Sequence, residues 1–288
     1  MAQRTVVLEL DAAQQDRLRE EIRAGEFELR SVEHAHFSAR APGIVATLYL
    51  SGKLVVQGVE AELFVQRFLG DVPPREQKDA GDEPLVGGDE SGKGDYFGPL
   101  VVAAVRIGPG DAARLRAGGV ADSKKVADGK VMRLGASLRG KFPHAIRSLD
   151  PPEYNRRHAA ERNVALILAA LYREVVEELF EPGVDVLIDQ FSKDKRRLER
   201  AFEGLDVKLH QRHHAESSMA VAAASILARE AFLRRLAELS EEHAIDLPKG
   251  AGPPVLDAGR RFLVLHGPDK LDLVAKTHFK TTQRLLPT

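Results

Sequence analysis

Three carboxylates lie within seven residues of the segment from Gly87 to Pro99, which reads GGDESGKGDYFGP. They are Asp89, Glu90 and Asp95, and glycines and one lysine separate them. Carboxylates this close repel one another unless a cation or a proton lies between them. Hard divalent cations such as Mg²⁺ bind to one or two carboxylates together with substrate phosphates, and glycines let the backbone approach such a ligand. The segment therefore predicts a metal site that faces a phosphate.

Two other interpretations of this segment remain open on its residues alone. Gly87, Gly92 and Lys93 fit the spacing of a nucleotide-binding P-loop, G-x-x-x-x-G-K-[ST]. That motif needs a hydroxyl for Mg²⁺ after the lysine, and Gly94 has none. The segment could also be a solvated acidic turn between two strands. The apolar run that follows at 100–107 argues against a turn that lies wholly at the surface.

Two further carboxylates stand at the ends of predicted elements. Asp189 closes the apolar stretch within VDVLIDQF, where a carboxylate is costly to bury without a partner. Glu216 comes just before a helix rich in alanine. A turn cap at Asp189 and a helix-dipole contact at Glu216 are simpler alternatives. Together with Asp89 and Glu90, these residues could form a four-carboxylate site, in which two metals about 4 Å apart would clamp the attacking water and the leaving oxygen of a phosphodiester.

The elements that must position these carboxylates indicate an α/β domain in the second part of the chain. Leu100–Ile107 and Val184–Ile188 are short apolar runs, as in buried strands, and Asn163–Phe180 has the length and pattern of a helix. A long helix is predicted over Ser217–Leu239. Its small side chains would let it pack closely on a sheet.

The first 70 residues are predicted to form a separate, small α+β unit. Its first helix, Ala12–Ala24, has Leu18 and Ile22 at i, i+4 spacing. The polar segment Asp71–Pro84, DVPPREQKDAGDEP, is rich in proline, glycine and charge, and is predicted as a linker. The domains are therefore predicted as 1–70 and 85–288, joined by 71–84. The other elements expected in the first unit are strands at Thr5–Leu10, Glu26–Ser31, His36–Arg40, Ile44–Leu50 and Lys53–Gln57, and a helix at Glu60–Leu69.

Composition and charge narrow the class of protein. With 43% hydrophobic residues the chain can bury a core, and without cysteine it has neither disulfides nor thiolate metal sites. No apolar run reaches the roughly 18 residues of a membrane span, so we expect a soluble, cytoplasmic protein. The net charge is −1, but 190–235 has ten Lys/Arg against six Asp/Glu, and 260–288 has six against two. Local basic surfaces of this kind suit a polyanion.

The motifs of the second part resemble those of type 2 ribonucleases H, specifically the bacterial ribonuclease HIII branch. They occur in the family's order over essentially the whole region after the linker. The first 70 residues resemble, more loosely, the TATA-binding-protein-like domain that ribonucleases HIII carry. The motifs are DESGKGDYFGP at Asp89–Pro99, DSKK at Asp122–Lys125, IDQF at Ile188–Phe191, AES and VAAASILAR within Ala215–Arg229, LPKGAG at Leu247–Gly252 and AKTHFK at Ala275–Lys280.

This resemblance implies a ribonuclease H-like fold, a mixed sheet flanked by helices, and an N-terminal substrate-binding domain. It implies four metal ligands, for two Mg²⁺ or Mn²⁺ ions, and a group of substrate-binding residues. The position of Glu216 is an aspartate in some relatives. The implied metal ligands and catalytic residues are Asp89, Glu90, Asp189 and Glu216, and the implied substrate contacts are Gly92, Lys93, Gly94, Ser123 and Lys124.

The activity that the resemblance implies is endonucleolytic hydrolysis of the RNA strand of an RNA–DNA hybrid, which leaves 5′-phosphate ends. No obligate protein partner is evident. A P-loop-like NTPase and a non-catalytic nucleic-acid-binding scaffold are the alternatives. Metal-dependent cleavage of a labelled hybrid separates the three. The residues His210, His213 and His214 form H-x-x-H-H, for which phosphate contact or solvation is expected over a zinc site, since no cysteine can complete one.

Overall fold

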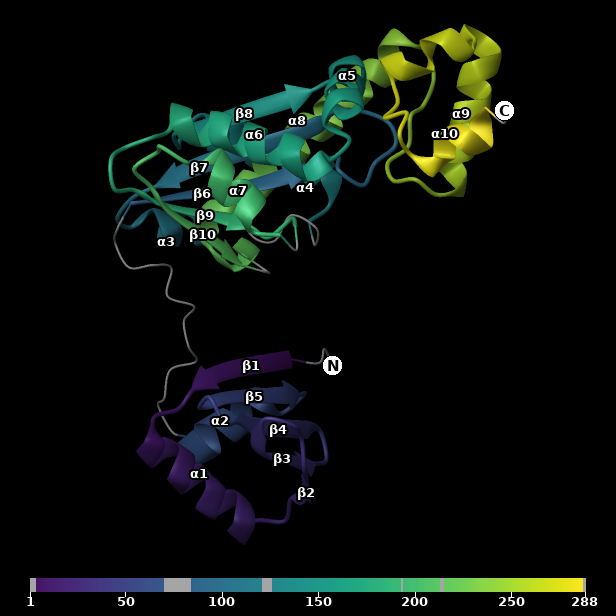
Figure 1. The fold of residues 1–288 in the computed structure, drawn as a ribbon. Helices are drawn as coiled ribbons and strands as arrows, with labels where there is room; N and C mark the ends of the chain where they lie inside the picture. Colours follow the sequence, from purple (N-terminus) through teal and green to yellow (C-terminus); the bar gives the residue numbers. More distant parts are fainter. Residues whose placement is uncertain (1–3, 70–83, 121–125, 193, 213–214, 287–288) are drawn as a thin grey trace. The chain divides into compact units, whose positions relative to one another are not determined.

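Two compact units, Met1–Lys78 and Asp79–Thr288, make up the chain in a computed structural model (Figure 1). The structure describes residues 4–69, 84–120, 126–192, 194–212 and 215–286. The predicted linker Asp71–Pro84 therefore lies, except for Pro84, outside the described residues. Each unit is described by itself below.

The N-terminal unit is a five-stranded antiparallel sheet in the order β1-β5-β4-β3-β2, with two helices on one face. Asp11 begins the first helix with a capping box, in which its side chain accepts from the amide of Gln14 (2.8 Å). The elements are β1 (Arg4–Glu9), α1 (Ala12–Ala24), β2 (Glu28–Arg30), β3 (Ala35–Ala41), β4 (Ile44–Tyr49), β5 (Lys53–Gly58) and α2 (Ala61–Leu69). The elements expected from the sequence are all present.

Alternation along these strands separates two faces of the sheet. In β4, Ile44 and Leu48 are buried against the helices, whereas Val45 and Thr47 are partly exposed. Leu18 and Ile22 of α1 complete this core, as their spacing predicted. The helices leave the second face of the sheet uncovered within this unit.

The second unit has a mixed five-stranded sheet in the order β10-β9-β6-β7-β8. Strands β6, β7 and β8 are antiparallel neighbours, whereas β9 and β10 run parallel to β6. The strands are β6 (Leu85–Ser91), β7 (Leu100–Ile107), β8 (His144–Leu149), β9 (Asp185–Asp189) and β10 (Lys208–Arg212). The sequence predicted β7 to the residue, because its apolar run is continuous and sharply bounded.

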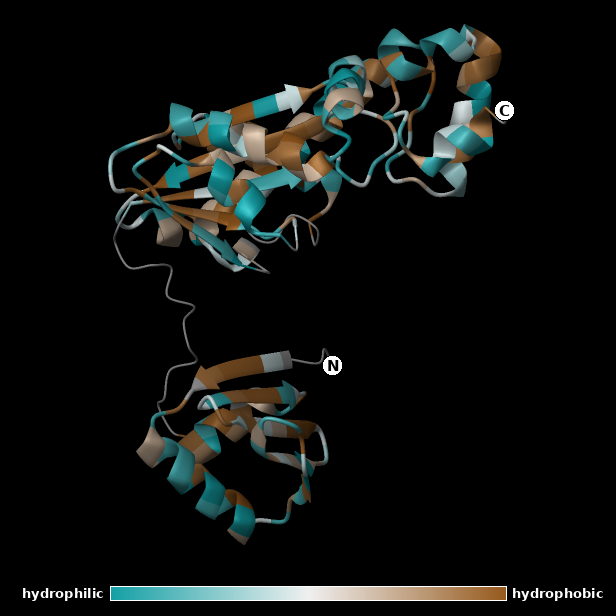
Figure 2. Cartoon of the chain, viewed as in Figure 1, coloured by the Kyte–Doolittle hydropathy of each residue, from teal (hydrophilic) through white to brown (hydrophobic). Residues whose placement is uncertain are grey.

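Helices cover both faces of this sheet (Figure 1). The 24-residue helix α8 (Met219–Glu242) lies on one face, and α6 (Val164–Glu178) lies on the other. A Cβ on Gly87 would lie 2.3 Å from the backbone of Ala220, so glycine lets α8 approach β6 closely. The expected close packing of the small helix face is confirmed. Figure 2 shows hydrophobic residues concentrated in the middle of this unit and more hydrophilic residues on the outer helix faces.

Shorter helices complete the second unit, and its C-terminal segments pack at one end. The helix predicted over Ser217–Leu239 begins as a separate 3-10 turn, η2 (Ala215–Ser217), before α8 starts. No helix in the described ranges is long and apolar enough to cross a membrane. The remaining helices are α3 (Asp111–Ala117), α4 (Asp128–Arg139), α5 (Pro151–Glu161), α7 (Arg196–Ala201), α9 (Pro253–His266), η3 (Pro268–Leu273) and α10 (Lys280–Leu285).

Candidate active site

Asp89 and Glu90 are consecutive residues near the end of β6, so their side chains point to opposite faces of the sheet. Asp89 faces α8, where it accepts a hydrogen bond from Ser225. Glu90 faces α6, where it accepts one from the hydroxyl of Tyr172. The pair therefore belongs to a strand rather than to a turn, and both helical layers support it.

Asp89 is a buried carboxylate with only 8% of its surface exposed. Burial, followed by the negative charge of Glu90, raises its pKa from 3.8 to about 7, and Asp189 acts in the same direction. Hydrogen bonds from Ser225 and from the amide of Glu90 (2.8 Å) oppose this shift only in part. The hydrogen bonds from the described residues therefore do not offset the cost of a buried negative charge at Asp89.

Glu90 is held by a small aromatic and cationic network. Burial raises its pKa, against the hydrogen bond from Tyr172 and the charge of Lys93. The Lys93 ammonium lies 3.5 Å from Glu90 Oε1 and donates to the carbonyl of Phe191 (2.9 Å). The Phe191 ring stacks on Tyr172, with centroids 5.3 Å apart. These contacts fix the orientation of the Glu90 carboxylate.

Asp189 ends β9 beside the end of β6. The last register pair of the two parallel strands joins Gly88 to Ile188, so Asp89 and Asp189 each follow it by one residue. Both side chains face α8, and Asp189 Oδ1 accepts a hydrogen bond from the amide of Ala215 (3.0 Å). The structure therefore brings Asp189 together with Asp89 and Glu90, although Asp89 and Asp189 are 100 residues apart in sequence.

The remaining predicted residues are described only in part. The backbone of Glu216 lies in η2, next to the Ala215 amide that binds Asp189, but its side chain is outside the described residues. Ser123 and Lys124 lie outside them altogether, as do His213 and His214.

The glycine-flanked segment after β6 separates into residues with different structural roles. Gly92 has a φ of +87°, and a Cβ there would lie 2.1 Å from the carbonyl oxygen of Pro99, so the turn itself requires glycine. A Cβ on Gly94 would have no neighbour within 4 Å, which leaves its backbone open to a ligand. Asp95 accepts from the amide of Gly250 (2.6 Å) and thus holds the LPKGAG loop.

Lys276 is a structural residue of this site that sequence reasoning missed. It is fully buried, and Nζ donates to the carbonyl oxygens of Asp95 (2.9 Å) and Gly98 (2.6 Å). It also lies 5.8 Å from the centroid of the Tyr154 ring. Burial lowers the pKa of Lys276 to about 7. The AKTHFK segment thereby anchors the turn that follows the carboxylates, while the neighbouring His278 stacks on His158 (4.1 Å).

The carboxylates fit a hard divalent cation by their chemistry. Asp89 and Asp189 supply neighbouring oxygen ligands, and a cation would relieve the burial and repulsion that raise the pKa of Asp89. Among the described side chains, no three Asp, Glu, His or Cys residues converge as a complete ligand set. A full set would need a further side chain, and the backbone of Glu216 lies in η2, directly after the Ala215 amide that binds Asp189.

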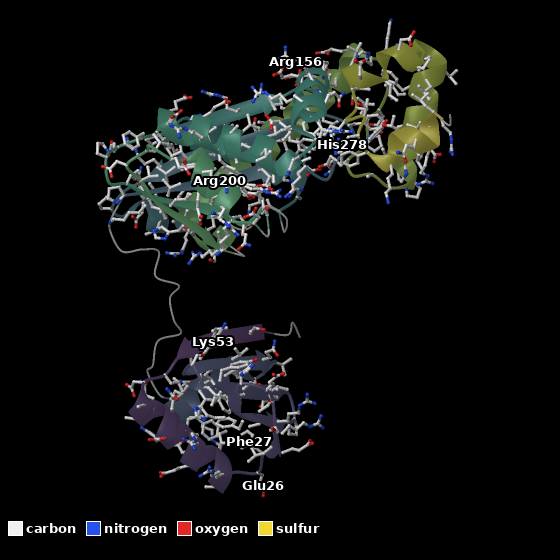
Figure 3. The ribbon with its side chains drawn as sticks, viewed as in Figure 1. Glu26, Phe27, Lys53, Arg156, Arg200 and His278 are labelled. Atoms are coloured by element: carbon white, nitrogen blue, oxygen red, sulfur yellow. The ribbon has the colours of Figure 1, made fainter. Side chains whose placement is uncertain are left out.

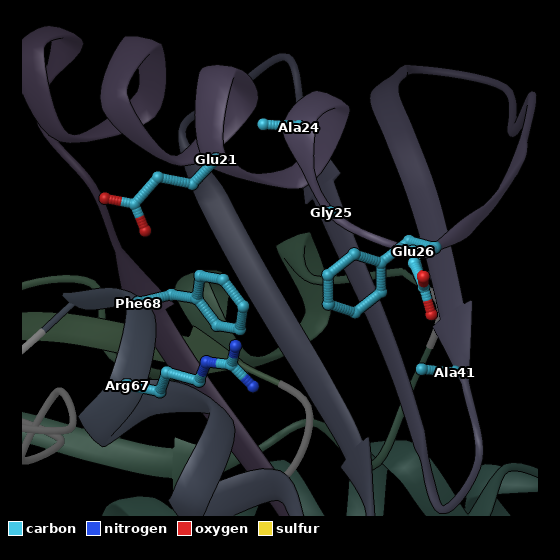
Figure 4. Close-up of a pocket in the computed structure, with 8 residues that line it drawn as sticks. Glu21, Ala24, Gly25, Glu26, Ala41, Arg67 and Phe68 are labelled. Atoms are coloured by element: carbon cyan, nitrogen blue, oxygen red, sulfur yellow. The ribbon is translucent and has the colours of Figure 1, made fainter.

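A separate open pocket of about 660 Å³ lies in the N-terminal unit (Figure 4). The Arg67 guanidinium lies 5.2 Å from the centroid of the Phe68 ring, and Phe27 meets Phe68 edge-on. Glu21 and Glu26 also line the pocket. With two carboxylates against one guanidinium in its lining, this pocket is poorly suited to a phosphodiester.

The sheet order, the helices on both faces and the carboxylates at the ends of β6 and β9 define a ribonuclease H-like α/β fold. The family model for ribonuclease HII matches residues 86–282. A second model, described as a domain of unknown function, matches residues 5–80. The chain therefore belongs to the ribonuclease HII family, in its ribonuclease HIII branch, and is a ribonuclease H.

Individual relatives extend this likeness over the full length. Ribonuclease HIII of Protochlamydia amoebophila is 37% identical, over 97% of this chain and 96% of that protein. Ribonuclease HIII of Chlamydia abortus is 38% identical, over 86% of each chain. The crystal structure of Bst-RNase HIII in complex with Mn²⁺ is 31% identical, covers 98% of both chains and has a TM-score of 0.68. Ribonuclease H2 from Pyrococcus horikoshii, at 21% identity and a TM-score of 0.61, shares the fold.

Proposed function

We propose that this ribonuclease H hydrolyses the RNA strand of RNA–DNA hybrids as an endonuclease, with two metal ions, and leaves 5′-phosphate ends. The observation that carries the proposal is the pairing of Asp89 and Asp189 on one face, at the carboxyl ends of adjacent parallel strands. The negative charge of Asp89 is undercompensated, as its raised pKa indicates. The Mn²⁺ complex of Bst-RNase HIII supports the use of a divalent metal.

Asp89, Glu90, Asp189 and Glu216 would hold the metals, which are Mg²⁺ or Mn²⁺. When bound, such ions activate a water molecule and stabilise the charge that develops on the leaving oxygen. The chain's own part is to keep the ligands oriented. Ser225 and the Ala215 amide hold the two aspartates from α8 and η2, and Tyr172 holds Glu90 from α6.

The glycine-flanked segment would meet the nucleic-acid backbone beside the metals. Gly94 is the position best suited to close approach, because a Cβ there would have no neighbour within 4 Å. Lys93 has 40% of its side chain exposed while it contacts Glu90, so it can meet a phosphate near the same carboxylate. Gly92, Ser123 and Lys124 are assigned to the substrate by resemblance to the family.

The N-terminal unit, residues 1–70, would bind the hybrid through the sheet face opposite its helices. Arg40, Lys53 and Gln57 are exposed on that face, beside Thr47 and Tyr49. Such side chains suit the phosphates and sugar hydroxyls of a duplex. In the full-length protein, Arg40→Gln and Lys53→Gln should weaken hybrid binding while turnover at saturating hybrid remains. Unchanged affinity in the double variant would contradict this role.

One assay tests the central proposal. A hybrid labelled on its RNA strand is incubated with Mg²⁺, with Mn²⁺ or with chelator, and the termini of the products are mapped. Internal cleavage that requires metal, ignores ATP and leaves 5′-phosphates is the expected result. Binding without cleavage would favour a scaffold instead. We also propose the cytoplasm as the compartment of this enzyme, because its proposed substrate forms where RNA pairs with DNA.

A further inference from the structure

We propose that the outer edge of the catalytic sheet, formed by Lys208, His210 and Arg212 of β10, binds the sugar–phosphate backbone of the nucleic-acid substrate. We call these three residues the basic edge. The inference rests on the proposed function, since it extends the site that would cut the hybrid. It assigns a surface outside both the glycine-flanked segment and the N-terminal unit.

The sheet register sets Arg212 beside the candidate metal site. Strands β10 and β9 are parallel, and the pairing joins Arg212 to Asp189. Paired residues on neighbouring strands lie about 4.8 Å apart and point to the same face. Asp89 follows on β6, so Asp89, Asp189 and Arg212 form one row across three strands, on the face of α8.

All three members of the basic edge point to that same face. Leu209, between them, packs with the core on the side of α6, so the alternate residues project the other way. Residues 208, 210 and 212 are exposed, and successive members stand about 6.6 Å apart along the strand. The edge is thus a line of basic side chains that ends next to Asp189.

The charges of the basic edge are not equally compensated. Asp185 lies 3.7 Å from Lys208 and 3.7 Å from His210, so one carboxylate serves two side chains that remain 71% and 56% exposed. Arg212 has no ion-pair partner among the described side chains. A planar guanidinium in this position can bind a phosphate with two parallel hydrogen bonds.

Contacts at the outer side of β10 hold the edge in place. Lys195 Nζ donates to the carbonyl of Gln211 (3.2 Å), and Gln211 Nε2 donates to the carbonyl of Lys195 (3.1 Å). The first of these hydrogen bonds occupies the carbonyl of Gln211 at the outer edge of β10, where a further strand would otherwise pair. Because the strand is fixed, Arg212 can offer a preorganised contact to a phosphate beside the carboxylates.

A simpler role for these cations would be to discourage pairing of the sheet edge with other chains. The two roles differ in the salt dependence of substrate binding. A residue that neutralises one phosphate contributes about 0.7–0.9 to the slope of log K against log salt, whereas an edge blocker contributes nothing.

The test compares Arg212→Gln with Arg200→Gln in the full-length protein. Arg200 is an exposed arginine of α7, which packs on the opposite face beside α6 (Figure 3). Both variants lose one positive charge from the surface of the second unit, on opposite faces of the sheet, so the pair separates a local contact from a general electrostatic effect. Hybrid affinity is measured in chelator over a range of salt concentrations, so that the metal-dependent reaction does not proceed.

Arg212→Gln should lower affinity roughly tenfold and reduce the salt slope by about one, regardless of hybrid sequence. Arg200→Gln should change neither, and Arg212→Lys should restore the slope. Equal slopes for Arg212→Gln and the wild type, or equal losses in both Gln variants, would overturn the basic edge. If the wild type fails to cut hybrids with metal, the proposed function fails. A wild type that cuts, with no effect at Arg212, refutes the basic edge alone.

Discussion

The substitution Asp89→Asn should stabilise the metal-free protein at neutral and alkaline pH. Asp89 is buried next to two other carboxylates, and its pKa rises from 3.8 to about 7. An asparagine keeps the shape and an acceptor oxygen for the Glu90 amide, and the Ser225 hydroxyl can accept from its NH2 group as well as donate. It removes the negative charge that the site would otherwise have to bury without metal.

The sign and size follow from proton linkage. Between pH 3.8 and about 7 the folded state binds more protons at Asp89 than the unfolded state, so wild-type stability falls as pH rises through this window. At about 1.4 kcal/mol for each pH unit, the full penalty above pH 7 is at most about 4 kcal/mol. For a domain of this size that corresponds to a rise in Tm of roughly 10 °C.

The assay is thermal melting in chelator from pH 4 to pH 9. The difference between Asp89→Asn and the wild type should be largest at pH 8 and should vanish near pH 4. Asp128→Asn is the matched control, because hydrogen bonds from Lys249 and Arg229 lower the pKa of Asp128. That group stabilises the fold above its unfolded pKa and loses this contribution as pH falls, so its removal should lower Tm at pH 8.

A Tm at or below the wild type for Asp89→Asn at pH 8 would refute the reasoning, as would a shift that does not vary with pH. Added Mg²⁺ or Mn²⁺ provides the second arm. It should raise the Tm of the wild type, since a ligand that binds only the folded state stabilises it, and should raise that of Asp89→Asn much less. The variant should also lose cleavage.

Substitutions at three further residues, with one control, test how the site is built and supported. Tyr172→Phe removes the hydroxyl that binds Glu90, so the metal concentration for half-maximal activity should rise about tenfold, whereas Tyr154→Phe, the buried control, should leave it unchanged. Glu216→Asp should retain part of the turnover in Mg²⁺ because it keeps the charge, whereas full activity in Glu216→Gln would reduce this residue to a helix-end cap. Lys276→Met leaves buried carbonyls without a donor, so Tm should fall by several degrees; an unchanged melting curve would contradict the anchoring role.

The bounds of helices and strands were predicted best for elements that are apolar throughout or along one face. Strand β7 and helix α1 match their predicted bounds, because continuous apolar residues mark the first and i, i+4 spacing marks the second. The strand β6 was harder to recognise. Its final residues, GGDES, have neither alternation nor β-branched side chains, and the glycines are there because α8 and Tyr172 pack against the strand.

The supporting residues of the site had no local signal. Tyr172 falls within a strongly apolar helix, where a buried aromatic residue is the ordinary expectation, and its partner Glu90 is 82 residues away. Lys276 lies in a polar segment, and its burial depends on carbonyl groups about 180 residues earlier in the chain. Neither partnership leaves a pattern of types or spacing. The partners of Tyr172 and Lys276 are far away in sequence, and the backbone acceptors that bind Lys276 are the same at every position.

Asp89 and Glu90 lie on opposite faces of β6, so the positions of these two consecutive side chains depend on two different hydrophobic cores. The first carboxylate takes its position from the layer of α8, and the second from the layer of α6. Packed layers shift as units rather than deform smoothly. A repacking that slides one helix over the sheet would therefore move the hydrogen-bond partner of one carboxylate and leave that of the other in place. Substitutions that change the packing of one core must therefore be compensated by substitutions in the core on the other face of the sheet if the site is to keep its geometry.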